Sequence, residues 1–374
     1  MTSIDEFRAG FDEDPGYLDF ARFGPIGRAV MEEDTALNAL IARSRFGSLA
    51  ELKAQGQRAH EAVADLTGLP SDHIVSQPNT SQGLMQAAFG VSGDVLASLG
   101  EFPDITFALT RTAESTGRVA PRWLETEHGQ VTPGMIRDQL TDDIVAVAVS
   151  LVDFRTGFVA DLDGIRQVIG DRLLIVDAIQ GFTVVDAPYQ VADVVVAGGQ
   201  TWVRAGWGTG FLALSDRAIE RIAPVLSGFS ATDDDDVPLD EVPPPTHGAA
   251  AFQISQADPL AQARFATALE GIADVGVPAI AGALAECTTR IIDLADEFAI
   301  PVSSSREPGQ RAGSVIITPD PDQLTVLTAS LHNHGVTATA RGGSVRLSPH
   351  VTTDEETFTM LRDSFISFAS AINP

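Results

Sequence analysis

Two kinds of apolar segment alternate along the first two thirds of the chain. Residues 49–67 carry apolar side chains at helical spacing, and Gly68 follows where that helix would end. Short, nearly continuous apolar runs recur after it, at 74–76, 95–99, 144–152, 173–176, 194–197 and 210–214. Runs of this kind are typical of strands that are covered on both faces. Helical segments lie between some of them, notably at 83–89 and 162–169.

Strands joined through helices predict an α/β fold. We expect a large three-layer α/β/α domain over residues 25–250, with a mostly parallel sheet at its centre. In such a sheet a ligand binds beyond the carboxyl ends of the strands.

The pattern changes after the large domain. Residues 227–247 contain a run of four aspartates and four prolines, which predicts an acidic, proline-rich surface loop. Helical patterns then cover 260–273, 279–297, 322–334 and 354–371, and strand patterns cover 314–318, 336–340 and 344–347. These elements predict a smaller α+β domain over 255–374, with residues 1–24 packed against it.

Composition and charge narrow the class of protein. The 374 residues are 44% hydrophobic and 20% charged, which is typical of a globular chain. The chain has no apolar run long enough to span a membrane and begins with an acidic segment, so we expect a cytoplasmic protein. The net charge of −27 disfavours nucleic acid and membrane surfaces as partners. Cys287 is the only cysteine, so neither an intramolecular disulfide nor a cysteine metal cage can form, and we expect no metal site.

Polar or aromatic residues follow several predicted strands. Thr80 and Ser81 open a predicted helix, where free backbone N–H groups favour an anion; ordinary helix capping is the alternative. Phe102, in the sequence EFP, could cover a flat ring or pack in the core. Asp177 ends the run LLIVD and Gln180 follows it; an aspartate there can pair with a cationic nitrogen such as a pyridinium, or cap the next helix. The glycine-rich stretch at 198–210 has no helix after it and does not match a dinucleotide fingerprint.

The order and spacing of these segments resemble the class V aminotransferases, a branch of the pyridoxal-phosphate (PLP) enzymes that includes cysteine desulfurases, kynureninases and isopenicillin N epimerase-like enzymes. The resemblance extends from YLDFARFGPI at 17–26 to VRLSPHVTTDEE at 345–356. It implies PLP transferase fold type I, a homodimer, and a small amino acid or carboxylate as ligand.

The resemblance also assigns roles to individual residues. It implies that Thr80 and Ser81 hold the cofactor phosphate, that Phe102 stacks on the pyridine ring, and that Asp177 pairs with the ring nitrogen. It places Gln180 near the phenolic oxygen and Arg346 on the substrate carboxylate, which a guanidinium fork suits. Ser255 lies near the point where the partner subunit contributes a phosphate contact.

The chain departs from the family at GGQTW, residues 198–202. The family pattern is Ser-x-His-Lys followed by an aromatic or aliphatic residue, so Gly198, Gln200 and Thr201 stand for the serine, the histidine and the Schiff-base lysine. A threonine hydroxyl cannot form an imine and is a poor base at neutral pH. Lys53 is the only lysine in the chain and lies in the predicted helix at 49–67. The site therefore looks rebuilt around Thr201.

A second departure concerns cysteine desulfurase activity. That activity uses a nucleophilic cysteine in the loop before the carboxylate arginine, and the corresponding loop here, GVTATARGGSVR, has none. Three hypotheses stay open: an enzyme that holds PLP without a covalent link, an enzyme that has abandoned PLP, and a catalytically silent pseudoenzyme that binds a ligand or partner on the same scaffold.

Overall fold

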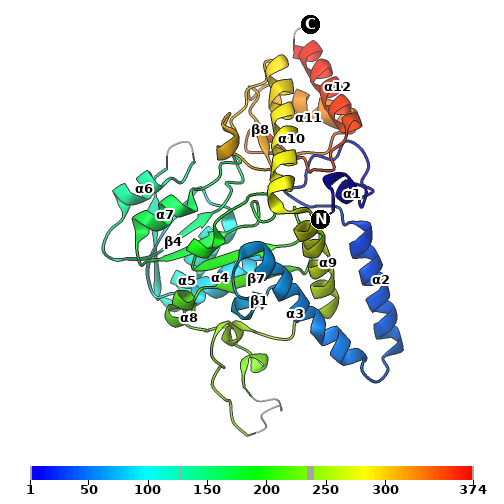
Figure 1. Cartoon of the computed structure of the whole chain (residues 1–374). Helices are drawn as coiled ribbons and strands as arrows, with labels where there is room; N and C mark the ends of the chain where they lie inside the picture. The colour runs from blue at the N-terminus through cyan, green and yellow to red at the C-terminus, as the bar shows by residue number, and fades with distance from the viewer. Residues whose placement is uncertain (1, 127–128, 234–239, 373–374) are drawn as a thin grey trace.

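The computed structural model describes residues 2–126, 129–233 and 240–372. A large body built on one sheet lies beneath a smaller one that contains the C-terminus (Figure 1). The large sheet has seven strands in the order β1-β7-β6-β5-β4-β2-β3, and β7 is antiparallel to both of its neighbours. The other strand pairs in this sheet are parallel. The strands are β1 (Ile74–Ser76), β2 (Gly93–Ser98), β3 (Val119–Leu124), β4 (Ile144–Ser150), β5 (Leu173–Asp177), β6 (Val194–Gly198) and β7 (Gly210–Leu214).

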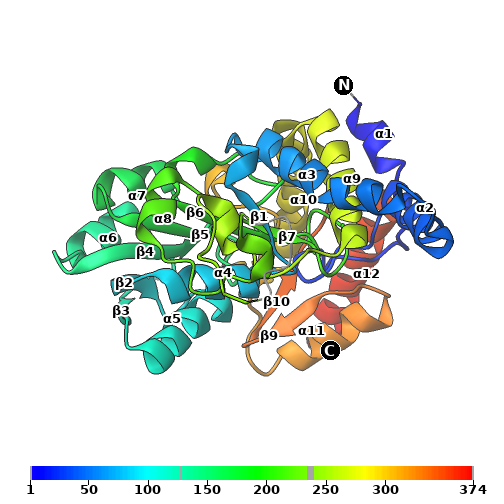
Figure 2. The same cartoon turned by 90° about the horizontal axis from the view of Figure 1, so that it is seen from below.

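Helices cover both faces of this sheet, as the apolar runs predict. In β5, Leu174 and Val176 face one hydrophobic cluster and Leu173 and Ile175 face the other, so the strand is buried on both sides. The first face is covered by α3 (Ser48–Thr67), α6 (Pro133–Gln139), α7 (Leu162–Ile169) and α9 (Pro259–Val275). The second is covered by α4 (Thr80–Gly90), α5 (Pro103–Thr116) and α8 (Asp216–Arg221). Figure 2 shows the sheet between α3 and α7 on one side and α5 on the other. The predicted three-layer α/β/α arrangement is confirmed.

The smaller body has its own apolar core. A three-stranded sheet of order β8-β10-β9 packs against three helices, and Leu18 from the N-terminal segment joins their cluster. Its elements are α10 (Val277–Glu297), β8 (Val315–Ile317), α11 (Leu324–Asn333), β9 (Thr339–Arg341), β10 (Ser344–Leu347) and α12 (Glu355–Ile372). Backbone bridges join Tyr17 to Thr337 and Asp19 to Ser348, so the N-terminal segment runs beside the small sheet.

Three helices lie around the junction of the two bodies. They are α1 (Ile4–Arg8), α2 (Arg28–Arg43) and α9, which packs against α2 and α3. Apolar residues of α9, such as Phe265 and Leu269, belong to the cluster beneath the large sheet. The division into domains at about residue 255 stays a proposal. In the described ranges no single helix is long and apolar enough to cross a bilayer; α9 and α10, bent by 83°, meet that criterion only as a pair.

Two of the elements that the apolar pattern did not predict, β3 and α2, have little buried surface. β3 pairs with β2 alone and contains Pro121, which an edge strand tolerates because its outer N–H needs no partner. In α2 only Val30 and Leu37 are buried, so the helix has no continuous apolar stripe.

A buried arginine ties the N-terminal segment to both bodies. Arg204 is 1% exposed, and its guanidinium donates to both carboxylate oxygens of Glu13 and to the carbonyl of Pro25. It also contacts His350 and Thr352 of the small body and lies 3.8 Å from the ring centre of Phe11. A buried guanidinium needs such partners, because losing its hydration is costly.

We predict that Arg204→Ala is strongly destabilising. It would leave the Glu13 carboxylate mostly buried with its cation removed, and breaking a buried pair in this way costs about 3–5 kcal/mol. Urea unfolding should show this loss. The matched control is Arg137→Ala, whose partner Asp138 is at the surface, with side-chain exposures of 67% and 68%; its loss should stay below about 1 kcal/mol. Equal, small losses in both variants would contradict the role assigned to Arg204.

Candidate active site

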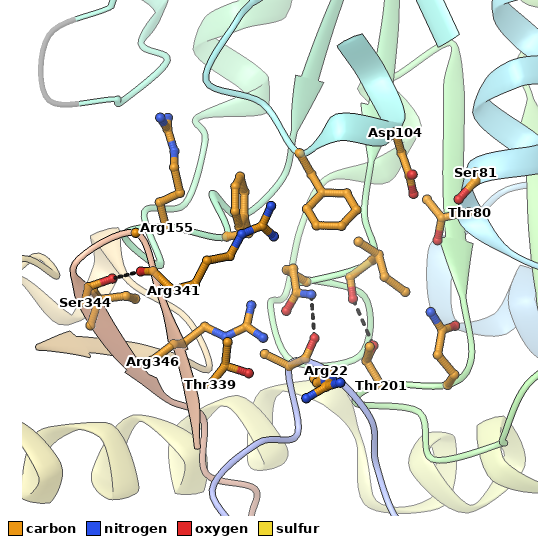
Figure 3. A pocket seen from close by; sticks show the side chains of 18 of the residues that line it. Arg22, Thr80, Ser81, Asp104, Arg155, Thr201, Thr339, Arg341, Ser344 and Arg346 are labelled. Carbon is orange, nitrogen blue, oxygen red and sulfur yellow. Dashed lines mark hydrogen bonds between the residues drawn. The ribbon is translucent and has the colours of Figure 1, made fainter. Parts of the chain in front are cut away.

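A cavity of about 620 Å³ lies between the large sheet and the small one (Figure 3). One wall is formed by residues that follow the carboxyl ends of the large strands: Asn79, Thr80, Ser81, Phe102, Asp104, Phe154, Arg155, Ile179, Gln180, Gln200 and Thr201. The other wall comes from the N-terminal segment and the small sheet: Ala21, Arg22, Ile316, Thr339, Arg341, Gly342, Ser344 and Arg346. The position agrees with the rule that ligands bind beyond strand ends in parallel sheets.

The helix N-terminus at α4 leaves a hydroxyl free at the cavity. Asn79 is the cap residue, and its side chain accepts the N–H of Gln82 at 2.9 Å. Thr80 is only 3% exposed, and its buried Oγ1 has no hydrogen-bond partner among the described residues. Capping is therefore done by Asn79, which leaves the Thr80 hydroxyl available to a ligand.

A carboxylate lies at the same end of the cavity. Asp104 is in the first turn of α5 beside Ser81, and burial raises its pKa although the Ser81 hydroxyl partly opposes that rise. A negative charge here acts against a phosphate at Thr80 and Ser81, and it favours a cationic group instead.

Two phenylalanines, Phe102 and Phe154, line the strand-end wall of the cavity. Phe102 is the N-cap residue of α5, followed by Pro103 at the first helical position. Its ring meets that of Phe154 edge to face, with centroids 5.2 Å apart. Phe102 lines the cavity, and stacking of a planar ligand on its ring stays a prediction.

Asp177 is the last residue of β5, and one of its two carboxylate oxygens has no hydrogen-bond partner among the described residues. Its Oδ1 accepts the N–H of Ile179 at 3.0 Å, whereas the buried Oδ2 has no partner among the described residues. The side chain is 1% exposed and does not itself line the cavity. Burial raises the pKa of Asp177 to about 8, and the charges of Asp104 and Glu101 add to the rise. Burial likewise raises the pKa of Glu101 to about 7. The described residues thus supply no partner for the buried Oδ2 of Asp177.

Gln180 and Thr201 line the cavity but are already bonded to protein groups. The Gln180 amide donates to the carbonyl of Ala21 at 2.8 Å and accepts the indole N–H of Trp202 at 3.2 Å. The Thr201 hydroxyl donates to the carbonyl of Ile179 at 3.2 Å. An amide and a hydroxyl are also poor bases at neutral pH. Lys53 is exposed on α3 and does not line the cavity.

Gly198 and Gln200 depend on each other. A Cβ atom added at Gly198 would lie 2.3 Å from the Gln200 side-chain oxygen and 3.2 Å from Thr80 Oγ1. The glutamine amide therefore occupies the space in front of Gly198, next to the free threonine hydroxyl. A serine at 198 would force Gln200 to move.

The small sheet contributes a wall of arginine. Thr339 lies opposite Arg346, and Arg341 opposite Ser344, in the β9–β10 hairpin. Because alternate residues of a strand share a face, all four side chains point to the same side, which is the cavity. Arg346 Nη2 is 3.8 Å from Asp19, and its buried Nε has no partner among the described residues. Burial lowers the pKa of Arg346, and the neighbouring charges of Arg341 and Arg22 lower it further.

Ser255 lies outside this cavity. It is exposed, and its hydroxyl contacts only the carbonyl of Gln256, at 3.5 Å. Cys287 is buried in α10 and does not line the cavity either. Within the described ranges, no group of three or more His, Cys, Asp or Glu side chains could hold a metal ion.

Sequence analysis did not single out five charged or aromatic residues of the cavity: Arg22, Asp104, Phe154, Arg155 and Arg341. Phe154 and Arg155 follow β4 directly, so the strand-end argument could have found them. The spacing of Arg341 and Arg346 about a Gly-Gly turn also indicates a shared face. No sequence pattern points to Arg22 or Asp104.

We predict that the buried Asp177 carboxyl makes the free energy of unfolding decrease as the pH rises. The unfolded chain releases this proton near the ordinary value of 3.8, and the folded chain holds it until about 8. Rising pH therefore costs stability between those values, because the folded state binds more protons. Relative to Asp177→Asn, the wild type should lose unfolding free energy steadily from about pH 5 to 8, measured by urea titration. A difference that does not change with pH would contradict the shifted pKa.

Comparison with known proteins places this geometry in a family. Residues 24–242 match the family model of class V aminotransferases. A probable cysteine desulfurase of Methanothermobacter thermautotrophicus is 28% identical over 211 residues, which are 54% of this chain and about half, 53%, of the relative.

Solved structures share the fold over nearly the whole chain. The apo cysteine desulfurase of Thermococcus onnurineus superposes with a TM-score of 0.86 at 19% identity, covering 97% of each chain. The cystine C–S lyase C-DES, in complex with cysteine persulfide, gives 0.84 at 16% identity, covering 94% of this chain and 97% of the lyase. These similarities confirm the predicted PLP transferase fold type I. The chain belongs to the class V aminotransferase family.

Proposed function

We propose that the cavity binds a small amino acid or a related carboxylate. One observation carries the proposal: the cavity has arginines on the small-sheet wall and Asp104 on the opposite wall. An amino acid has both charges, so its carboxylate can bind the first wall while its ammonium group faces the second. Arg346 is the residue that would hold the carboxylate.

The lack of close hydrogen-bond partners for Arg346 among the described residues supports this assignment. Its partner Asp19 is 3.8 Å away, which is too long for a direct hydrogen bond, and Asp19 Oδ1 already accepts the Thr339 hydroxyl at 2.7 Å. The Nε of Arg346 is unpaired. A bound carboxylate would give the guanidinium the two-point partner that its geometry favours.

The residues are suited to PLP only as a non-covalent ligand. Phe102 lines the cavity and offers an aromatic face to a planar ring, and the unpaired Oδ2 of Asp177, although buried outside the lining, is the acidic group that a ring nitrogen would pair with. No lysine lines the cavity, however, and the Thr201 hydroxyl is engaged, so the ring has no covalent anchor. When bound, PLP supplies an electron sink for carbanion chemistry. A C-DES variant with one lysine replaced by alanine contains glycine covalently linked to its PLP cofactor, which supports binding of PLP that is linked to an amino acid rather than to the protein.

The alternative function is a ligand-binding pseudoenzyme that does not use PLP. Two observations favour it. Asp104 puts negative charge beside Ser81, and Gln200 fills the space in front of Gly198 next to Thr80. Both act against a phosphate at the N-terminus of α4.

We also propose that the protein is a homodimer, as the family implies. Ser255 and its neighbour Ile254, which is 50% exposed, lie outside the cavity of their own chain. A phosphate contact from Ser255 would therefore need a second copy of the chain.

Binding of a simple amino acid tests the proposed function. L-alanine should bind the wild type, and Arg346→Gln should weaken binding roughly 10-fold or more, as expected when a charge-assisted hydrogen bond of about 1.5–3 kcal/mol is lost. Titration calorimetry, with and without PLP, measures both. Arg43→Gln on exposed α2 removes the same charge away from the cavity and should bind like the wild type. Equal affinity of Arg346→Gln and wild type would refute the site.

A second prediction concerns covalent attachment of the cofactor. After incubation with PLP and reduction with borohydride, the protein should gain no phosphopyridoxyl mass, because Thr201 cannot form an imine. Only a small fraction of Thr201→Lys should form the adduct, because Gly198, Gln200 and Asp104 make a poor binding site for the cofactor phosphate. Intact-mass measurement and a spectral titration with PLP read out both proteins. An adduct on the wild type would overturn the prediction, and tight binding by Thr201→Lys would show that only the lysine was lost.

A further inference from the structure

The cavity wall formed by the N-terminal segment and the small sheet contains three arginines, and one ligand carboxylate cannot balance all of their charge. Arg22, Arg341 and Arg346 lie close enough that the charges of the first two depress the pKa of the third. Among the described residues Arg22 and Arg341 have no ion pair, and Arg346 has only the distant Asp19. This concentration of like charge is notable in a chain whose net charge is −27. A single carboxylate on Arg346 would leave Arg341 uncompensated.

From this excess we infer that the ligand has a second anionic group, bound by Arg341 and Arg155 beside the carboxylate site at Arg346. The inference rests on the proposed function and narrows its substrate class. The ligand would be an amino acid with an acidic side chain, or the corresponding small dicarboxylate.

The β9–β10 hairpin fixes the spacing of the two subsites. Gly342 and Gly343 have φ values of 58° and 85°, and two consecutive residues with positive φ are the requirement of a tight type I′ turn. The Ser344 hydroxyl donates to the carbonyl of Arg341 at 3.0 Å across the turn. Arg341 and Arg346 are then diagonal neighbours on one face of the hairpin, with backbones roughly 7–8 Å apart. Guanidinium groups at this spacing can receive the two carboxylates of one small molecule.

A phenylalanine from the opposite wall joins Arg341 to Arg155. The guanidinium carbon of Arg341 is 5.9 Å from the ring centre of Phe154, and that of Arg155 is 5.8 Å from the same centre. Arg155 has a partial partner in Asp153, at 3.3 Å, whereas Arg341 has none among the described residues. Both guanidinium groups therefore lie near one ring, and Arg155, Arg341 and Phe154 all line the cavity. The second anionic group would bind there, away from Asp104.

Matched pairs of amino acids test the inference. L-aspartate and L-asparagine, and likewise L-glutamate and L-glutamine, differ little in shape but carry different charges. We expect the full-length wild type to bind the acidic member about 10-fold or more tightly in calorimetry, with or without PLP. Arg341→Gln should reduce this preference to about two-fold or less. Arg43→Gln should retain it, and thermal unfolding should confirm that both variants are folded.

The possible failures are distinguishable. Equal binding of the acidic and amide members by the wild type would overturn the second subsite and leave the proposed function intact. A preference that survives in Arg341→Gln would also overturn it, because the discrimination would then come from elsewhere. Absence of binding by all four amino acids, in both conditions, would overturn the proposed function together with the inference.

Discussion

The buried Arg204 guanidinium is the contact on which the cavity depends. It bonds to Glu13 and Pro25 of the N-terminal segment and to Thr352 of the small body, while its own backbone belongs to the loop after β6. The same loop accepts the N–H of Gly24 at the carbonyl of Gln200, 2.8 Å away. The segment is thereby fixed so that the carbonyl of Ala21 receives Gln180. The N-terminal segment, the loop after β6 and the small body are thus held together, because the buried Arg204 guanidinium needs hydrogen-bond partners from all three.

The cavity lies beyond the carboxyl ends of the strands, where ligands bind in sheets of this kind. Phe102 and Arg346 line it, and the buried Nε of Arg346 has no partner among the described residues. In the segment 198–201 the Thr201 hydroxyl is bonded to the carbonyl of Ile179, and the Gln200 side chain occupies the space in front of Gly198. The result is a cavity with Arg22, Arg341 and Arg346 on one wall and with Asp104 on the other, where Arg155 also lies. That arrangement suits a small zwitterion or dianion better than it suits a covalently held phosphate ester.

The sequence predicts the elements whose burial requires a recognisable pattern of apolar residues. Six strands of the large sheet were predicted because they are apolar on both faces, and β3 was missed because an edge strand is not. Residues at strand ends, such as Thr80 and Asp177, could be found from order alone. Arg22 and Asp104 could not, because their place at the cavity is set by tertiary packing. The unpaired state of Asp177 and Arg346 was equally inaccessible, since it depends on what the chain fails to bring near them.

The central claim is that Arg346 and Asp104 orient an amino acid across the cavity. A crystal structure of the protein grown with L-aspartate tests this most directly. The claim predicts an α-carboxylate paired with Arg346 and an ammonium group turned toward the Asp104 wall. A ligand bound in the reverse orientation, or one outside the cavity while Arg346 pairs with a protein carboxylate, would contradict it.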